Sequence, residues 1–181
     1  MRIDTGVIIE NPGWISIGDD VWIDKYVILS AGPVVFSKED IIKRKCNWIS
    51  NVNEGELTIG SRCHIGAFNI LQAHGGIKIG SDVTTSAFVK VYSLSNMSNN
   101  PSNLEEITFA NCLAKGKVAY IIGPVEIENG VWIGLDSIIL PGVKIGEYSF
   151  IRSKSLVISN IERNSVAGGN PARRIKERFK I

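Results

Sequence analysis

Residues 123–157 read GPVEIENGVWIGLDSIILPGVKIGEYSFIRSKSLV, and an aliphatic side chain returns in this stretch at every sixth position. The series consists of Ile127, Ile133, Ile139, Ile145, Ile151 and Val157. A period of six matches neither the 3.6 residues of a helical turn nor the two residues of an amphipathic strand. It favours short strands joined by tight turns, three to a coil, with the aliphatic side chain pointing into a triangular prism on each face.

The same step of six recurs earlier in the chain, in three blocks that start at Ile17, Ile59 and Ile79. Together with residues 127–157, these blocks hold an aliphatic residue at 14 of 15 positions, the exception being Thr85. Ile, Val and Leu make up 52 of the 181 residues, so chance would give roughly four. The position after the aliphatic is often glycine, which we expect to help the chain round each corner. After a partial turn, the pattern predicts five coils, each rising about 4.8 Å, which begin at Ile17, Ile59, Ile79, Ile127 and Ile145.

Length and composition bound the class of protein. A chain of 181 residues predicts one domain over residues 1–181. A net charge of +2 does not suggest general affinity for nucleic acid, and no apolar run reaches the roughly 18–20 residues of a membrane span. The three cysteines form no CxxC pair, which favours reduced thiols in a cytoplasmic protein over a disulfide framework.

Three segments break the period. Residues 35–56 and 97–120 are predicted to be loop insertions that leave the coil, and such insertions in repeat proteins often carry the binding function. In residues 171–181, PARRIKERFKI, every charged residue is basic except Glu177. This segment is predicted to form a short C-terminal helix that begins at the proline. The same tail could also act as a polar cap on the open end of the prism.

The sequences VWIG, ILPGVKIG and GGNPARRIK, within roughly residues 15–34 and 57–178, closely resemble the hexapeptide-repeat acyltransferases. The closest resemblance is to the branch that acetylates maltose, galactosides and other sugars. It implies an all-β fold, a left-handed parallel β-helix, whose hand departs from the usual right-handed crossover rule and comes from the resemblance alone. It also implies a homotrimer that uses acetyl-CoA, with active sites in the clefts between adjacent prisms.

The resemblance implies a track of acetyl-CoA contacts along the later coils. Backbone groups suit the amide-rich pantetheine arm, and arginine or lysine suits the phosphates. Simple packing could instead explain the tryptophan, and a solvated surface could explain the basic residues. The residues at the matching positions are Trp132, Gly134, Leu135, Ser153, Ile158, Gly168, Arg173 and Lys176.

For catalysis, the resemblance implies a histidine that acts as general base just before the long loop. In the matching stretch VKVYSLSNMSNN that slot holds Asn96, and asparagine can orient an acceptor but cannot act as a base. One alternative is that His74, one coil earlier beside the Gly75–Gly76 pair, is a relocated base that stacks about 5 Å from the Asn96 slot.

The other alternative is an amine acceptor that needs no protein base. In that case Tyr92, Ser95 and Asn96 would orient the acceptor. The second histidine of the chain, His64, sits between repeat residues, so we expect it to be structural.

The function predicted from these residues is transfer of acetyl from acetyl-CoA to a sugar or sugar nucleotide in bacterial surface-polysaccharide synthesis. The partners are a second and third copy of the chain and the sugar substrate, without nucleic acid and without a metal ion. A metal hydrolase built on this prism would need three histidines, and the chain has two. The remaining alternative is a non-catalytic trimeric scaffold that kept the prism and lost its base at Asn96.

Overall fold

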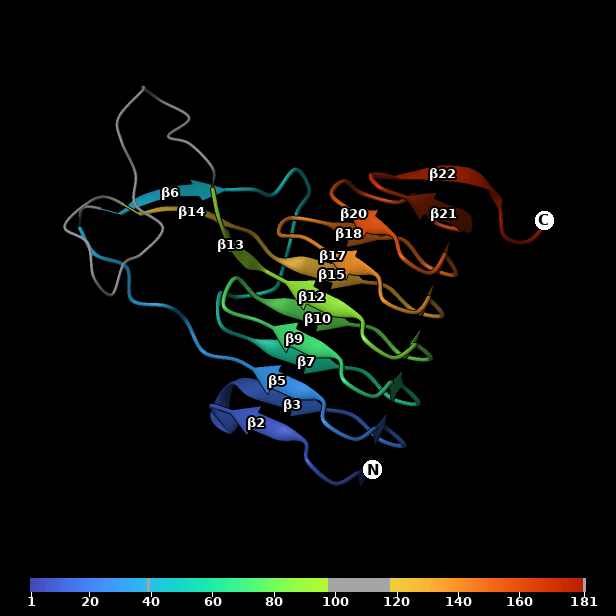
Figure 1. The fold of residues 1–181 in the computed structure, drawn as a ribbon, viewed down its shortest axis with the longest axis horizontal. Coiled ribbons are helices and arrows are strands. Elements are labelled where there is room, and N and C mark those ends of the chain that lie inside the picture. The colour runs from blue at the N-terminus through green and yellow to red at the C-terminus, as the bar shows by residue number, and fades with distance from the viewer. Residues whose placement is uncertain (39, 98–117, 181) are drawn as a thin grey trace.

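In the computed structural model, residues 1–38, 40–97 and 118–180 are described, and they wind into a three-sided, left-handed parallel β-helix (Figure 1). Each strand pairs in parallel with the strand one coil further on, so that Ile23 lies beside Ile65 and Ile65 lies beside Thr85. The coils predicted from the period of six are therefore confirmed. Residues 98–117, which include Cys112 and most of the second predicted insertion, lie outside the described residues.

Three parallel sheets, here called faces A, B and C, form the sides of the prism. Within each coil the chain passes from face C to face A and then to face B. Face A contains β1 (Arg2–Ile3), β4 (Trp22–Ile23), β8 (His64–Ile65), β11 (Thr84–Thr85), β16 (Trp132–Ile133), β19 (Phe150–Ile151), β21 (Ser165–Gly169) and β22 (Ala172–Glu177). Face B contains β2 (Ile8–Glu10), β5 (Ile28–Ser30), β9 (Ile70–Gln72), β12 (Lys90–Tyr92), β17 (Ile138–Ile139) and β20 (Leu156–Val157). Face C contains β3 (Ile15–Ile17), β7 (Leu57–Ile59), β10 (Ile77–Ile79), β15 (Val125–Ile127) and β18 (Lys144–Ile145).

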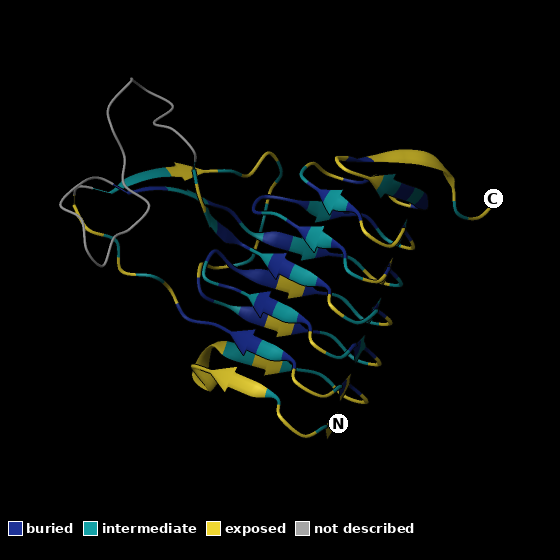
Figure 2. Cartoon of the chain, in the orientation of Figure 1, coloured by how far each residue is buried: buried dark blue, intermediate teal, exposed yellow. Residues whose placement is uncertain are grey.

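The aliphatic residues of the repeat fill the interior of the prism. Ile23, Leu71 and Ile133 are fully buried, and in Figure 2 the middle strands carry buried positions, whereas the first and last strands of the stack, β2 and β22, are mostly exposed. Thr85, the one polar repeat residue, is also fully buried. Its hydroxyl accepts a hydrogen bond from Asn69 Nδ2 at 2.5 Å, and Asn69 Oδ1 accepts one from the Val89 amide at 2.7 Å. The core tolerates this polar pair because its buried groups are satisfied.

The backbone geometry at the corners of the prism explains which residue types the repeat requires there. The left-handed backbone conformation falls three positions after the inward aliphatic, as at Phe68 and Asp82, where φ is 59° and 60°. Glycine one position after the aliphatic has another reason. A Cβ placed on Gly60 would lie 2.6 Å from the carbonyl carbon of Gly80 in the next coil, closer than two such atoms can approach. These glycines therefore permit the close approach of successive coils.

Both insertions leave the prism at the corner between faces B and C, and each of them contributes a strand. Strand β14 (Ala119–Ile122) pairs antiparallel with β13 (Leu94–Asn96) and parallel with β6 (Ile41–Arg44), forming a small side sheet that projects from the prism (Figure 1). Residues 35–56 were predicted to be a loop, and the structure shows that they also contain a strand, β6. This strand forms because the backbone of β14 offers it an edge.

The first insertion then returns along the same corner. The amide of Lys45 donates to the Ile122 carbonyl at 2.8 Å, and Asn47 Oδ1 accepts from Asn160 Nδ2 at 2.9 Å. Further on, Gly55 accepts a hydrogen bond from the Gly32 amide at 2.8 Å. The insertion is therefore tied to the coils at both of its ends.

The predicted C-terminal helix is wrong. Residues Ala172–Glu177 form β22, which pairs antiparallel with β21 and places Arg173 opposite Gly168. An edge strand leaves unpaired backbone groups, and the strand that covers β21 satisfies them, in line with a capping role for the tail. The helical structure among the described residues is the 3-10 turn η1 (Pro12–Trp14). No helix in this part of the chain is long and apolar enough to cross a bilayer.

The buried Thr85–Asn69 pair generates a stability prediction. We expect Thr85→Val to lower the free energy of unfolding by about 1–3 kcal/mol, although the two side chains have the same shape, because Asn69 Nδ2 loses its acceptor. The measurement is urea unfolding at fixed protein concentration in a double-mutant cycle with Asn69→Ala. The loss in the double variant should fall short of the summed single losses by at least about 0.5 kcal/mol, and additive losses would contradict the pairing.

Candidate functional site

The outer surface of face A carries an aromatic and basic patch near the C-terminal hairpin. Trp132 is 46% exposed and its ring meets the Phe150 ring edge-on, with centroids 5.4 Å apart. Beside Phe150 lies a shallow surface depression of about 380 Å³ that Arg152 and Lys176 also line. Its remaining walls are Val166 and Ile175. The patch therefore offers apolar contact and two cations next to one another.

The neighbouring corner, between faces A and B, brings together most of the other predicted acetyl-CoA contacts. Gly134 packs against the next coil so tightly that a Cβ there would lie 2.5 Å from the Ser153 amide nitrogen. The carbonyl of Leu135 accepts a hydrogen bond from Lys154 at 2.8 Å. In the hairpin, Gly168 lies against the Arg152 side chain. Trp132, Gly134, Leu135, Ser153, Gly168 and Lys176 thus lie on neighbouring strands and corners. Arg173 instead lines a separate depression with Ser159 and Glu162.

Ile158, the eighth predicted contact, lies elsewhere, at the corner between faces B and C. Its carbonyl oxygen accepts a hydrogen bond from Lys45 Nζ at 2.8 Å. Burial lowers the pKa of the Lys45 ammonium, and nearby Lys43 lowers it further. This contact could not be predicted from the repeat, because Lys45 belongs to an insertion that interrupts it.

His74 occupies the corner between β9 and β10, where faces B and C meet, and it is half-buried. Its Nδ1 lies 2.8 Å from the Gly32 carbonyl oxygen. A carbonyl can only accept, so Nδ1 carries the proton and Nε2 keeps the lone pair. Nε2 makes no hydrogen bond with the residues that the structure describes. His74 is thus held in the tautomer that a general base requires.

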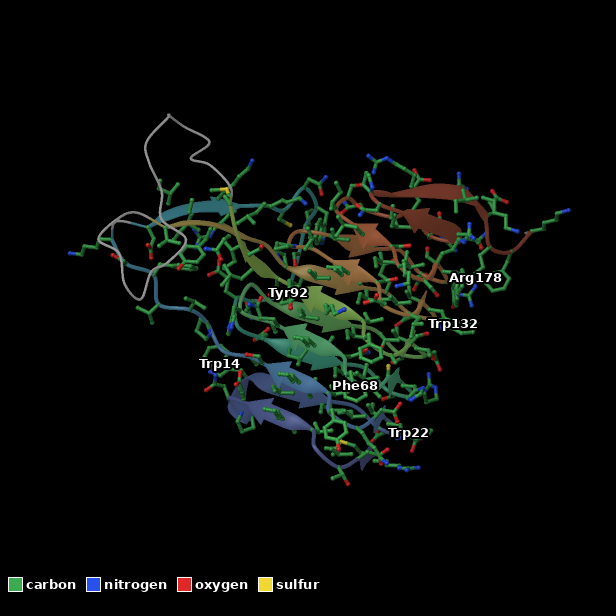
Figure 3. The ribbon with its side chains drawn as sticks, in the orientation of Figure 1. Trp14, Trp22, Phe68, Tyr92, Trp132 and Arg178 are labelled. Carbon is green, nitrogen blue, oxygen red and sulfur yellow. The ribbon has the colours of Figure 1, made fainter. Side chains whose placement is uncertain are left out.

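The predicted acceptor-orienting residues separate from one another. Tyr92 ends β12 and pairs with Gln72 in the coil below, and Figure 3 shows it at the opposite end of the visible face from Trp132. Beyond it the chain leaves the coil, and Asn96 pairs with Tyr120 in the side sheet while Ser95 pairs with Ile121. Asn96 was expected to lie one coil above His74. The parallel pairing of these two coils ends at Tyr92, and Asn96 lies in the side sheet instead.

His64 makes structural contacts on the outer surface of face A. Its ring stacks on Trp22, with centroids 4.7 Å apart, and its Nε2 lies 2.9 Å from Asp24 Oδ2. Among the described residues, no group of three His, Cys, Asp or Glu side chains is arranged to hold a metal ion. The base candidate of this geometry is therefore His74.

The two halves of the site lie at opposite edges of face B. Five residues separate the corner at Phe88 from the corner at Ser93, which corresponds to about 16 Å of extended chain. The aromatic and basic patch on face A and the His74 side chain are therefore far apart within one chain. A small acyl group could contact both the patch and His74 only if its carrier extended across face B, or if a second copy of the chain supplied either the patch or the histidine.

The chain is similar to known acyltransferases in sequence and in structure. No family model matches the chain. A chloramphenicol acetyltransferase of Klebsiella aerogenes is 43% identical over 75 residues, which cover 41% of this chain and 34% of that protein. The chain therefore spans about a third of the length of the curated relatives it matches first.

Solved structures match over nearly the whole chain. The N-acyltransferase AntD of Bacillus cereus, in a variant complexed with dTDP and coenzyme A, superposes with a TM-score of 0.76 at 28% identity, covering 98% of this chain and 80% of that one. A hexapeptide-repeat acetyltransferase of Vibrio cholerae matches with a TM-score of 0.55 at 20% identity, covering 99% and 71%, and supports the fold alone. The fold is a left-handed β-helix, and the chain is similar to acetyltransferases in sequence and to an N-acyltransferase in structure.

Proposed function

We propose that this protein transfers an acetyl group from acetyl-CoA to a sugar carried on a nucleotide, preferentially to an amine of that sugar. The observation that carries the proposal is the hydrogen bond from His74 Nδ1 to the Gly32 carbonyl, because it leaves Nε2 as a proton acceptor. An amine acceptor suits the departure at Asn96, since an amine is a stronger nucleophile than a hydroxyl. AntD, the N-acyltransferase that matches the chain, has been crystallised in another variant with dTDP-4-amino-4,6-dideoxyglucose and coenzyme A.

In this reaction the lone pair of the acceptor amine attacks the thioester carbonyl carbon of acetyl-CoA. A carbon–nitrogen bond forms and the carbon–sulfur bond breaks, so that the electron pair leaves on the sulfur. The nitrogen loses one proton, which Nε2 of His74 accepts and which then neutralises the coenzyme A thiolate. The products are the acetamido sugar and coenzyme A.

The donor would lie on the face A patch. Trp132 and Phe150 offer apolar contact, while Arg152, Arg173 and Lys176 offer donors that match phosphate. Arg152 was missed at the sequence level because it falls at an ordinary outward position of the repeat. The structure adds the observation that it lines the same depression as Lys176.

We propose a homotrimer in which each active site uses two copies of the chain. Support comes from the outward column of face B, which is apolar at every described coil except at Lys90, whose Nζ is paired with Asp136 Oδ1 at 2.7 Å. Apolar columns of this kind favour burial against another copy. The column consists of Ile8, Ile28, Ile70, Ile138 and Leu156.

The cellular setting belongs to the same proposal. The described cysteines, Cys46 and Cys63, are both free thiols, in keeping with a reducing cytoplasm. Acylated sugar nucleotides are building blocks of polymers, so bacterial surface-polysaccharide synthesis is the setting we propose.

The first prediction concerns His74. We expect His74→Gln to lower kcat by about 10²–10⁴-fold, because the proton of the attacking amine loses its acceptor. The loss should shrink as pH rises, since hydroxide in the solvent can then accept the proton that His74 Nε2 would have taken. The measurement is thiol release from acetyl-CoA with dTDP-4-amino-4,6-dideoxyglucose as the acceptor.

His64→Gln is the matched control, because it removes the only other imidazole while keeping a hydrogen-bonding side chain beside Asp24. It should leave kcat unchanged. Full activity in His74→Gln would instead indicate acylation without a protein base. A wild-type protein that neither releases thiol with amino or hydroxyl sugar nucleotides nor binds coenzyme A would favour the scaffold alternative.

The second prediction concerns the donor patch. We expect Arg152→Ala and Lys176→Ala each to raise the dissociation constant of coenzyme A roughly tenfold at low salt, because each removes a cation facing phosphate. Calorimetric titration measures the effect. Lys78→Ala on face C, where Lys78 faces Glu126 at 3.7 Å, is the matched control. Unchanged binding in both patch variants would exclude this surface.

The third prediction concerns the shared site. When His74→Gln and Arg152→Ala/Lys176→Ala chains are co-expressed in equal amounts, about a quarter of the clefts in all randomly assembled trimers would join two intact halves. Activity should therefore exceed the sum of the two separately made variants. Activity no greater than that sum would mean that each chain holds a complete site.

A further inference from the structure

One column of polar side chains on face B has no role in the acetyl transfer proposed above. The last outward position of four successive strands holds Glu10, Ser30, Gln72 and Tyr92, and the strand register places each beside the next. Two positions earlier, three of these strands carry Ile8, Ile28 and Ile70, whereas β12 carries Lys90. A polar column at the edge of an apolar face, directly before the corner of His74, indicates a binding surface rather than packing.

The lower end of the column is already organised. Ser30 is 8% exposed, and its hydroxyl donates to Glu10 Oε2 at 2.6 Å. This bond uses the one proton of the serine and leaves Glu10 Oε1 as a free acceptor, since a carboxylate has no proton to give. The pair therefore presents acceptors to whatever lies above it.

The middle of the column contains an unsatisfied group. Gln72 Oε1 is buried and has no hydrogen-bond partner among the described residues. The backbone carbonyl of the same residue is well satisfied, because both the Ser93 amide and the Ser93 hydroxyl donate to it, at 3.0 and 2.7 Å. A buried oxygen without a donor destabilises a protein by about 1–3 kcal/mol, so its persistence calls for a donor from outside these residues.

The chemistry of the neighbours defines that donor. Gln72 Oε1, Glu10 Oε1 and His74 Nε2 are all acceptors, and His74 follows Gln72 by two residues at the corner. A molecule that matches three acceptors on stacked coils must bring several N–H or O–H groups. A sugar with an amine next to a hydroxyl has this pattern, whereas a planar aromatic compound with few donors does not.

We infer that the column Glu10–Ser30–Gln72 is the subsite for the acceptor sugar, with Gln72 Oε1 accepting a hydrogen bond from a hydroxyl beside the reacting amine. This inference rests on the proposed function, and it moves acceptor recognition from Ser95 and Asn96 in the side sheet to the strands of face B. Gln72 is a positioning residue in this scheme, and Glu10 favours an amine acceptor over a hydroxyl.

The decisive variant is Gln72→Met, which keeps the length of the side chain and removes the oxygen. The KM for dTDP-4-amino-4,6-dideoxyglucose should rise about tenfold, while the KM for acetyl-CoA stays the same. The unliganded variant should also have a Tm at least as high as the wild type, because an unpaired buried oxygen is gone. A residue with only a structural role would not combine a weaker acceptor site with undiminished stability.

Thr58→Met on face C is the matched control, since it introduces the same side chain at an exposed strand position away from the proposed subsite and from the apolar column of face B. It should leave the acceptor KM unchanged. Glu10→Gln should raise the KM for the amino sugar nucleotide more than that for dTDP-6-deoxyglucose, its hydroxyl counterpart. An unchanged acceptor KM in Gln72→Met, with an active wild type, overturns this inference alone. A wild type inactive with every acceptor overturns the proposed function itself.

Discussion

The stacking of each coil on the next is the constraint on which the rest of the structure depends. Parallel ladders hold successive strands at about 4.8 Å, and the register is strict, since Leu57, Ile77 and Val125 lie directly above one another on face C. Any side chain therefore has its counterpart one coil away. A column of like residues becomes a surface stripe, and a single departure such as Gln72 or Thr85 is placed with the same accuracy as the repeat itself.

The period of six was sufficient to predict the prism because the signal is local and repeated. The glycine that follows the aliphatic residue was expected to let the chain turn at the corner, and this expectation was wrong. The residue with the left-handed backbone lies three positions after the aliphatic and is often not glycine, as at Phe68. The C-terminal strand was not predictable for a different reason. Residues 172–177 have no strong preference that excludes a helix, and the edge of β21 that recruits them is a tertiary feature that their own composition does not encode.

The candidate site shows the same division between local and distant information. Most of the residues proposed to bind acetyl-CoA could be predicted to lie near one another, because they sit at fixed positions of neighbouring repeats. The state of His74 could not, because the carbonyl that sets its tautomer belongs to Gly32, 42 residues earlier and at the start of an insertion. Gln72 was equally invisible, since an unpaired buried oxygen is a property of the folded surroundings and not of a glutamine in a strand.

This arrangement explains how a base could change position while the fold remained intact. A general base must lie near the acceptor atom and have a free lone pair, and neither condition fixes the coil from which it comes. At the corner between faces B and C, successive coils place residues one above another, next to the insertions. A histidine one coil earlier can replace the missing one if an insertion supplies an acceptor for its second nitrogen. The Gly32 carbonyl provides that acceptor here, and under the proposed function it therefore compensates for the asparagine at position 96.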